Sequence, residues 1–217
     1  MHQPLSKLKR DTVYTLAPED GHTVLRAEAD SAASFYMAHF NPAVGVPAIL
    51  SWRWKTDALV PGADNRDKTR EDAPLRVILA FDGDHATLPQ AEQRFLRTTR
   101  LPYAMLMYIW SDHVPVESVI PSAHTSRIKM VVVASGAGGL GSWHTVRRNV
   151  ADDYVRAYGT APGPVLSVAV MTDTDNTRTH AVGHYADIRF ECARGVDSTR
   201  DRERPPDRPV EEPDREH

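Results

Sequence analysis

Short apolar runs, separated by loops rich in Gly, Pro, Asp and Asn, make up most of the chain. In residues 48–55 (AILSWRWK) apolar and charged positions alternate, so the two tryptophans share one face of a strand and the arginine and lysine share the other. The runs LRVILAF (75–81) and YAMLMYIW (103–110) are apolar on both faces, which predicts buried central strands. Similar patterns predict further strands in segments 12–16, 23–29, 127–135, 165–171 and 184–190.

One segment has the period of a helix. In NVADDYVRAYG, Asn149 is placed as an N-cap and two aspartates follow in the first turn, where the helix dipole favours anions. Gly159 occupies the position just past the C-terminus. We therefore expect one short helix at about residues 150–158, while residues 88–99 have a helix-forming composition inside a long connection. Many strands without regular strand–helix alternation predict an antiparallel β-sandwich rather than a parallel sheet.

Composition divides the chain into two parts. Residues 1–193 are predicted to form a single β-sandwich domain, and residues 194–217 a disordered tail, because the tail is mostly Arg, Asp, Glu and Pro and has too little apolar surface to offset its ordering entropy. The formal charge of −3 argues against a nucleic-acid partner. The single cysteine excludes an intrachain disulfide, and no apolar run is long enough for a membrane span.

The stretch MTDTDNT (171–177), directly after an apolar run, raises three possibilities: a turn, a ligand-binding rim or a metal loop. Counted from Asp173, an EF-hand loop would require glycine where the chain has Arg178 and glutamate where it has His184. A looser calcium site would use Asp173 and Asp175 with backbone carbonyls. A turn held by its own Asp and Asn side chains is the structural alternative. We predict no metal and no cofactor.

Other chemistry-bearing residues have equally simple structural explanations. The face made by Trp52 and Trp54 is either the sandwich interior or the floor of a binding groove, and Trp110 lies on a predicted core strand. Asp72 precedes a buried strand, and a structural ion pair with Arg76 is the simplest interpretation. The chain contains no Gly-x-Ser-x-Gly elbow and no phosphate-binding loop, so we name no catalytic residue.

Several ordered motifs resemble the bacterial domain of unknown function 3047 family over about residues 5–192. They are LSWRWK (50–55), EDAPLRVILAF (71–81), YIW (108–110), VVVASG (131–136), WHTVRRNVADDYVRAYG (143–159) and VAVMTDTDNTRTHAVGHYADIRF (168–190). This resemblance implies a secreted or periplasmic protein, although the start of the chain shows no hydrophobic signal segment. The closing YADIRF strand also looks like the end of galactose-binding-like jelly rolls, which implies a jelly-roll sandwich with MTDTDNT on its rim.

These observations lead to an uncharacterised, non-enzymatic binding module for a carbohydrate or another small polar ligand. The alternatives are a hydrolase or lyase acting on a glycan, and a structural protein of envelope assembly. The candidate ligand-binding residues are Trp52, Trp54, Asp72, Arg76, Trp110, Asp173, Asp175 and Asn176.

Overall fold

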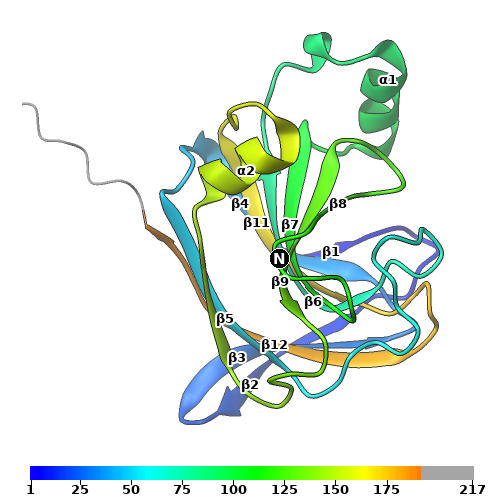
Figure 1. Cartoon of the computed structure of the whole chain (residues 1–217), viewed down its shortest axis with the longest axis vertical. Helices are drawn as coiled ribbons and strands as arrows, with labels where there is room; N and C mark the ends of the chain where they lie inside the picture. Colours follow the sequence, from blue (N-terminus) through cyan, green and yellow to red (C-terminus); the bar gives the residue numbers. More distant parts are fainter. Residues whose placement is uncertain (192–217) are drawn as a thin grey trace, which may run out of the picture.

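The computed structural model describes residues 1–191, which form two stacked β-sheets (Figure 1). The larger sheet has seven strands in the spatial order β1 (His2–Pro4), β4 (Ser34–Val44), β11 (Val165–Asp173), β6 (Ala73–Phe81), β7 (Ala104–Ser111), β9 (Ile128–Ser135) and β8 (Val119–Pro121). The smaller sheet has five, in the order β10 (His144–Arg148), β5 (Ile49–Thr56), β12 (His180–Glu191), β3 (His22–Asp30) and β2 (Val13–Glu19). The predicted all-β sandwich is confirmed.

One strand pair departs from the predicted antiparallel pattern. Strands β7 and β9 pair in parallel, whereas β8 pairs antiparallel with β9. The reason is the path of the chain, which leaves β7, forms the edge strand β8 and then returns as β9 between the two.

The described chain contains two α-helices rather than the single one expected. Helix α2 (Val150–Tyr158) begins and ends as predicted, because the Asn149 side chain accepts a hydrogen bond from the Asp152 amide and Gly159 adopts a φ of 74°. Helix α1 (Gln90–Thr99) follows a 3₁₀ turn, η1 (His85–Thr87), in the connection between β6 and β7. This is the segment whose composition favoured a helix. It buries only Leu96, so its apolar face is narrow.

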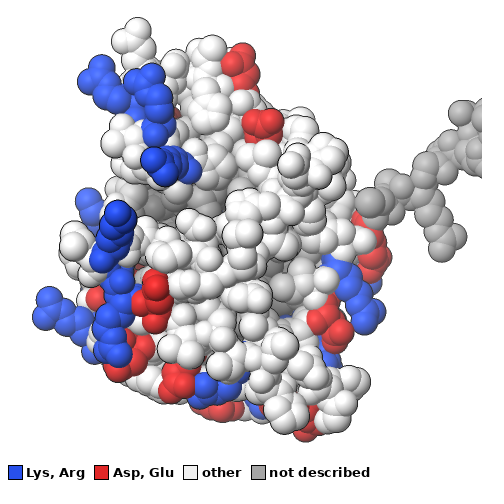
Figure 2. All heavy atoms as spheres, turned by 180° about the vertical axis from the view of Figure 1, so that it is seen from behind, with Lys and Arg blue, Asp and Glu red and all other residues white. Residues whose placement is uncertain are grey.

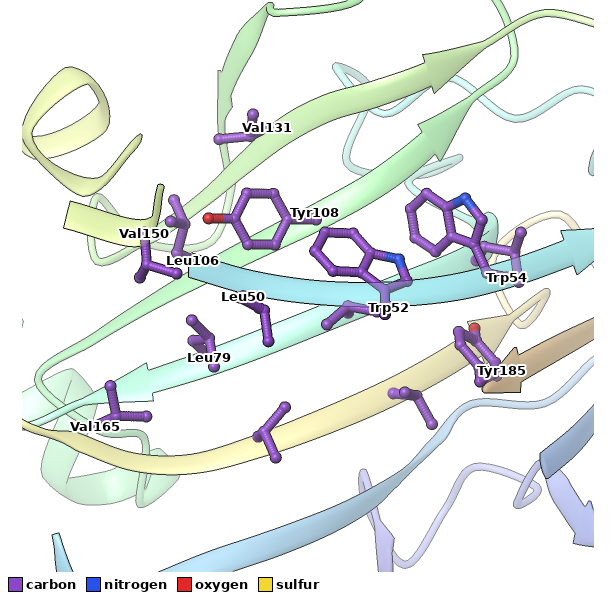
Figure 3. Packing of buried hydrophobic residues seen from close by; sticks show 14 of the residues in the cluster. Leu50, Trp52, Trp54, Leu79, Leu106, Tyr108, Val131, Val150, Val165 and Tyr185 are labelled. Carbon is purple, nitrogen blue, oxygen red and sulfur yellow. The ribbon is translucent and has the colours of Figure 1, made fainter. Parts of the chain in front are cut away.

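The main core lies between the two sheets and follows the predicted alternation. On β5 the side chains of Leu50, Trp52 and Trp54 point toward the larger sheet, where they meet β6 and β7 (Figure 3). The Trp52 ring lies 5.1 Å from the Tyr108 ring. A second buried cluster, which includes Ile78, explains why β6 and β7 are apolar on both faces.

The helices and the surface charges of the described residues bear on how the protein meets its surroundings. Among residues 1–191 neither helix is long and apolar enough to cross a membrane. Figure 2, viewed from behind, shows few charged side chains in the centre of that face, and acidic and basic side chains together at the edge where the described chain ends. The predicted tail, residues 194–217, and the domain boundary at residue 193 lie outside the described residues.

Candidate functional site

The three tryptophans proposed from the sequence as ligand contacts are core residues. Trp52 is 1% exposed, and Trp54 and Trp110 are fully buried. The rings of Trp52 and Trp54 pack on each other with 5.3 Å between their centroids (Figure 3). The Trp54 and Trp110 rings lie 6.4 Å apart. Of the two alternatives left open for the tryptophan face of β5, the structure therefore places it in the sandwich interior.

The other five proposed residues come together at one end of the larger sheet. Asp173 ends β11, Arg76 lies on the adjacent strand β6, and Asp72 immediately precedes β6. Asp175 and Asn176 belong to the loop between β11 and β12. Carboxylate oxygens of the three aspartates all lie within 4.8 Å of one another. We call Asp72, Asp173 and Asp175 the aspartate cluster.

A buried ion pair is the centre of this cluster. Arg76 donates to Asp173 from Nε (2.7 Å) and from Nη2 (3.0 Å), and both side chains are almost completely buried. Arg76 Nη2 also donates to the Glu71 carbonyl at 2.6 Å. Burial raises the pKa of the Asp173 carboxyl to about 7, although the Arg76 charge opposes this effect. The two residues therefore join neighbouring strands at a dry position.

Asp72, which is not part of the MTDTDNT loop, binds this loop through its carboxylate. Its carboxylate accepts hydrogen bonds from the Asn176 amide (3.3 Å), the Thr177 amide (2.7 Å) and the Thr177 hydroxyl (2.7 Å). Asp175 forms an ion pair with Lys9 in the N-terminal segment. The loop is thus a turn, as one interpretation of the sequence had it, but its principal acceptor is a residue from a distant part of the chain.

The aspartate cluster has little capacity left for a cation. Arg76 engages Asp173, Lys9 engages Asp175, and three donors of the loop engage Asp72. Calcium requires six to eight oxygen ligands. To serve as such ligands, these carboxylates would first have to break their bonds to their present partners. Asn176 is exposed and makes no side-chain hydrogen bond within residues 1–191. The arrangement stabilises one end of the sandwich and offers no open site.

A polar pocket lies instead on the outer face of the smaller sheet. It has a volume of about 220 Å³ and crosses the three strands β10, β5 and β12. Its lining is polar and charged except for one tryptophan, whose side chain points to the core: Ser51, Trp52, Arg53, Thr145, Arg147, Asp187, Arg189 and Glu191. We call this the β10–β5–β12 pocket.

A β-bulge shapes this pocket. The pairing between β12 and β5 shifts register between Ala186 and Arg189, and Asp187 inside the bulge has a φ of 53°. A non-glycine residue in this left-handed region is uncommon, and bulges often redirect a side chain beside a functional site. Here the bulge directs Asp187 toward Arg53, whose Nε donates to Asp187 Oδ2 at 2.8 Å.

The remaining contacts leave hydrogen-bonding groups available in the pocket. Arg147 donates to both oxygens of Glu191, at 2.8 and 3.0 Å. Arg189 donates to Asp187 Oδ1 over a longer 3.3 Å. The hydroxyls of Ser51 and Thr145 have no hydrogen-bond partner among the described residues. The pocket therefore combines free hydroxyls with arginine donors that are only partly used.

Trp143, the one tryptophan that the sequence did not single out as a candidate, contacts Arg53, which lines this pocket. It is partly exposed, and the Arg53 guanidinium lies 5.0 Å from its ring. The signal was present in the alternation of Trp143, Thr145 and Arg147: Thr145 and Arg147 are exposed positions of β10, and Trp143 immediately precedes the strand. That run is short and follows a glycine-rich segment, so the pattern is weak by itself.

Comparison with known proteins assigns the chain to a family without assigning it an activity. The family model described as "Protein of unknown function (DUF3047)" matches residues 1–189. The chain belongs to the DUF3047 family. No curated protein matches it.

Proposed function

We propose that this DUF3047 protein is a non-enzymatic binding module for a hydroxyl-rich ligand, with a carbohydrate as the ligand class. The observation that carries the proposal is the β10–β5–β12 pocket, in which charged side chains and free hydroxyls converge on one face of a sheet. Sugar recognition depends on such a set of polar groups held by a rigid scaffold. Three hydrogen-bonded strands supply that scaffold here.

The pocket supports binding better than catalysis. Its two carboxylates, Asp187 and Glu191, are each engaged by an arginine. A glycosidase would need one carboxyl group that donates a proton and another that acts as base or nucleophile. The aspartate cluster, which also holds several carboxylates, is largely buried and already partnered. Secretion or an envelope location, expected from the family resemblance, remains part of the proposal.

A glycan panel with three variants tests this function. The wild-type protein is expected to bind at least one class of glycan on the panel, and Thr145→Val and Trp143→Ala are expected to weaken that binding. Thr15→Val is the matched control, because Thr15 is also exposed on the outer face of the smaller sheet but lies on β2, away from the pocket. Release of new reducing ends from the bound glycan would instead favour the enzymatic alternative.

Two results would overturn the proposal. Absence of binding to every glycan would reject the carbohydrate class. Binding that is equally strong in wild type, Thr145→Val and Trp143→Ala would place the ligand elsewhere on the molecule.

A further inference from the structure

The charge balance of the β10–β5–β12 pocket narrows the class of ligand. Three arginines (Arg53, Arg147 and Arg189) face two carboxylates (Asp187 and Glu191), which leaves one uncompensated positive charge. One carboxylate of a ligand, placed inside the pocket, would neutralise this charge, whereas a neutral sugar would leave the charge in place. We infer that the pocket binds an acidic sugar of the uronate type, an inference that rests on the function proposed above.

Arg53 and Arg189 are the arginines available to such a ligand. Both donate to Asp187, Arg53 to Oδ2 and Arg189 to Oδ1, so their guanidinium groups flank the same carboxylate. Neither Nη atom of Arg53 has an acceptor within residues 1–191, and the Arg189 side chain is 71% exposed. Arg147 differs, because both of its Nη atoms already bind Glu191.

Arg53 is also held in position before any ligand arrives. Its Nε is fixed by Asp187 at 2.8 Å, and the Trp143 ring supports the guanidinium at 5.0 Å. A guanidinium fixed in this way loses little conformational entropy when it binds a carboxylate through two parallel hydrogen bonds. The hydroxyls of Ser51 and Thr145 lie in the same pocket and provide partners for sugar hydroxyls. Charge and hydroxyl recognition therefore occur together.

Isothermal titration calorimetry with matched trisaccharides tests this inference. Trigalacturonate is compared with galactotriose and with fully methyl-esterified trigalacturonate, which keeps the shape of the acidic sugar and loses its charge. We expect trigalacturonate to bind at least about tenfold more tightly than either neutral trimer, since bonds between charged partners are the stronger ones. The preference should shrink as sodium chloride rises from about 50 to about 500 mM, because salt screens exposed charges.

Three arginine variants identify the residues responsible. Arg53→Gln and Arg189→Gln are each expected to lower the affinity for trigalacturonate about tenfold or more and to leave the affinity for the neutral trimers nearly unchanged. Arg94→Gln is the control, because Arg94 is exposed on α1 and its loss changes the net charge by the same amount. A thermal melt of each variant confirms that it is folded.

The outcomes separate this inference from the proposed function. Equal affinity for charged and neutral trimers would overturn the acidic-sugar class and leave the carbohydrate-binding proposal intact. If no trimer and no glycan of the panel bound, both the acidic-sugar inference and the carbohydrate-binding proposal would be rejected. Binding of inorganic phosphate alone, at the same affinity as trigalacturonate, would show a simple anion site and would also overturn the acidic-sugar class.

Discussion

Arg76 and Asp173 form an almost completely buried, two-pronged ion pair between β6 and β11, with nitrogen–oxygen distances of 2.7 and 3.0 Å. The same guanidinium reaches the sulfur of Met130 at 3.4 Å and the Glu71 carbonyl at 2.6 Å. One arginine therefore joins two adjacent strands and the segment that precedes β6. Such a pair is costly to bury, but it is more costly to break from one side only.

Removing only the cation of this pair should be strongly destabilising. At pH 8, above the raised pKa of Asp173, Arg76→Gln leaves the Asp173 carboxylate buried with no positive partner, and we expect the free energy of unfolding to fall by about 3 to 5 kcal/mol. Arg10→Gln is the comparison, since its pair with Asp30 is exposed on both sides and should contribute less than about 1 kcal/mol. Urea denaturation measures both changes. Similar losses in the two variants would contradict the structural role of Arg76.

The raised pKa of the Asp173 carboxyl should be visible in the pH dependence of the free energy of unfolding. Its pKa is raised from 3.8 to about 7 by burial, so between these values the folded state holds a proton that the unfolded state releases. Stability from this group is therefore fully present below about pH 4 and is lost as the pH rises to 7. Denaturant titrations across that range should show a falling contribution in the wild type that Asp173→Asn lacks. A parallel pH dependence in the two proteins would refute this prediction.

The sequence predicted the fold better than the position of the candidate site, because the two depend on interactions of different range along the chain. Strands β5, β6 and β7 were predictable because alternation or continuous apolar character is a local property. Strand β4 was not predicted, since it contains Asn41 and Pro42 and has exposed positions along both faces. The β7–β9 parallel pair depends on the order of strands in space, which no local pattern reports.

The candidate residues show the same limit. The sequence suggested an ion pair between Asp72 and Arg76, but the structure pairs Arg76 with Asp173 instead. Asp72 binds a loop about a hundred residues away, which no local pattern could show. The pocket on β10, β5 and β12 exists because three strands that are distant in the chain are neighbours in the sheet. Its bulge at Asp187 depends on strand register, so the residues around it were missed.

The stability that the MTDTDNT loop contributes should depend more on Asp72 than on Asn176, the exposed residue of the loop itself. Asp72→Ala removes the acceptor of two amides and one hydroxyl, each contributing on the order of 1 kcal/mol, so a loss of about 2 to 3 kcal/mol is expected. Asn176→Ala should change stability by less than about 0.5 kcal/mol, because that side chain is exposed. Thermal or urea unfolding distinguishes the two. A larger loss for Asn176→Ala would mean that the loop holds itself.

Calcium should leave the melting temperature unchanged. The carboxylates of the aspartate cluster are occupied by Arg76, Lys9 and the loop amides, so a cation would have to displace existing partners. A calcium site present only in the folded state would raise the free energy of unfolding by about 2.7 kcal/mol when the calcium concentration is a hundredfold above Kd. A melting experiment resolves a change of this size. A rise in Tm that disappears in both Asp173→Ala and Asp175→Ala would establish the metal interpretation and reject ours.

Variants of Trp54, which faces the core, and of Trp143, which contacts Arg53, should differ in their effects on stability and on ligand binding. Trp54 is fully buried against Trp110, so Trp54→Ala is expected to reduce the free energy of unfolding by about 3 to 5 kcal/mol through the lost contacts and the cavity. Trp143 is only partly buried, and its ring lies 5.0 Å from the Arg53 guanidinium. Trp143→Ala should therefore cost about 1 kcal/mol of stability while it weakens binding of the acidic trisaccharide, because Arg53 is no longer held against the ring. Urea denaturation and calorimetric titration of the same two variants give both quantities. If Trp143→Ala left binding unchanged, the indole would have no part in positioning Arg53.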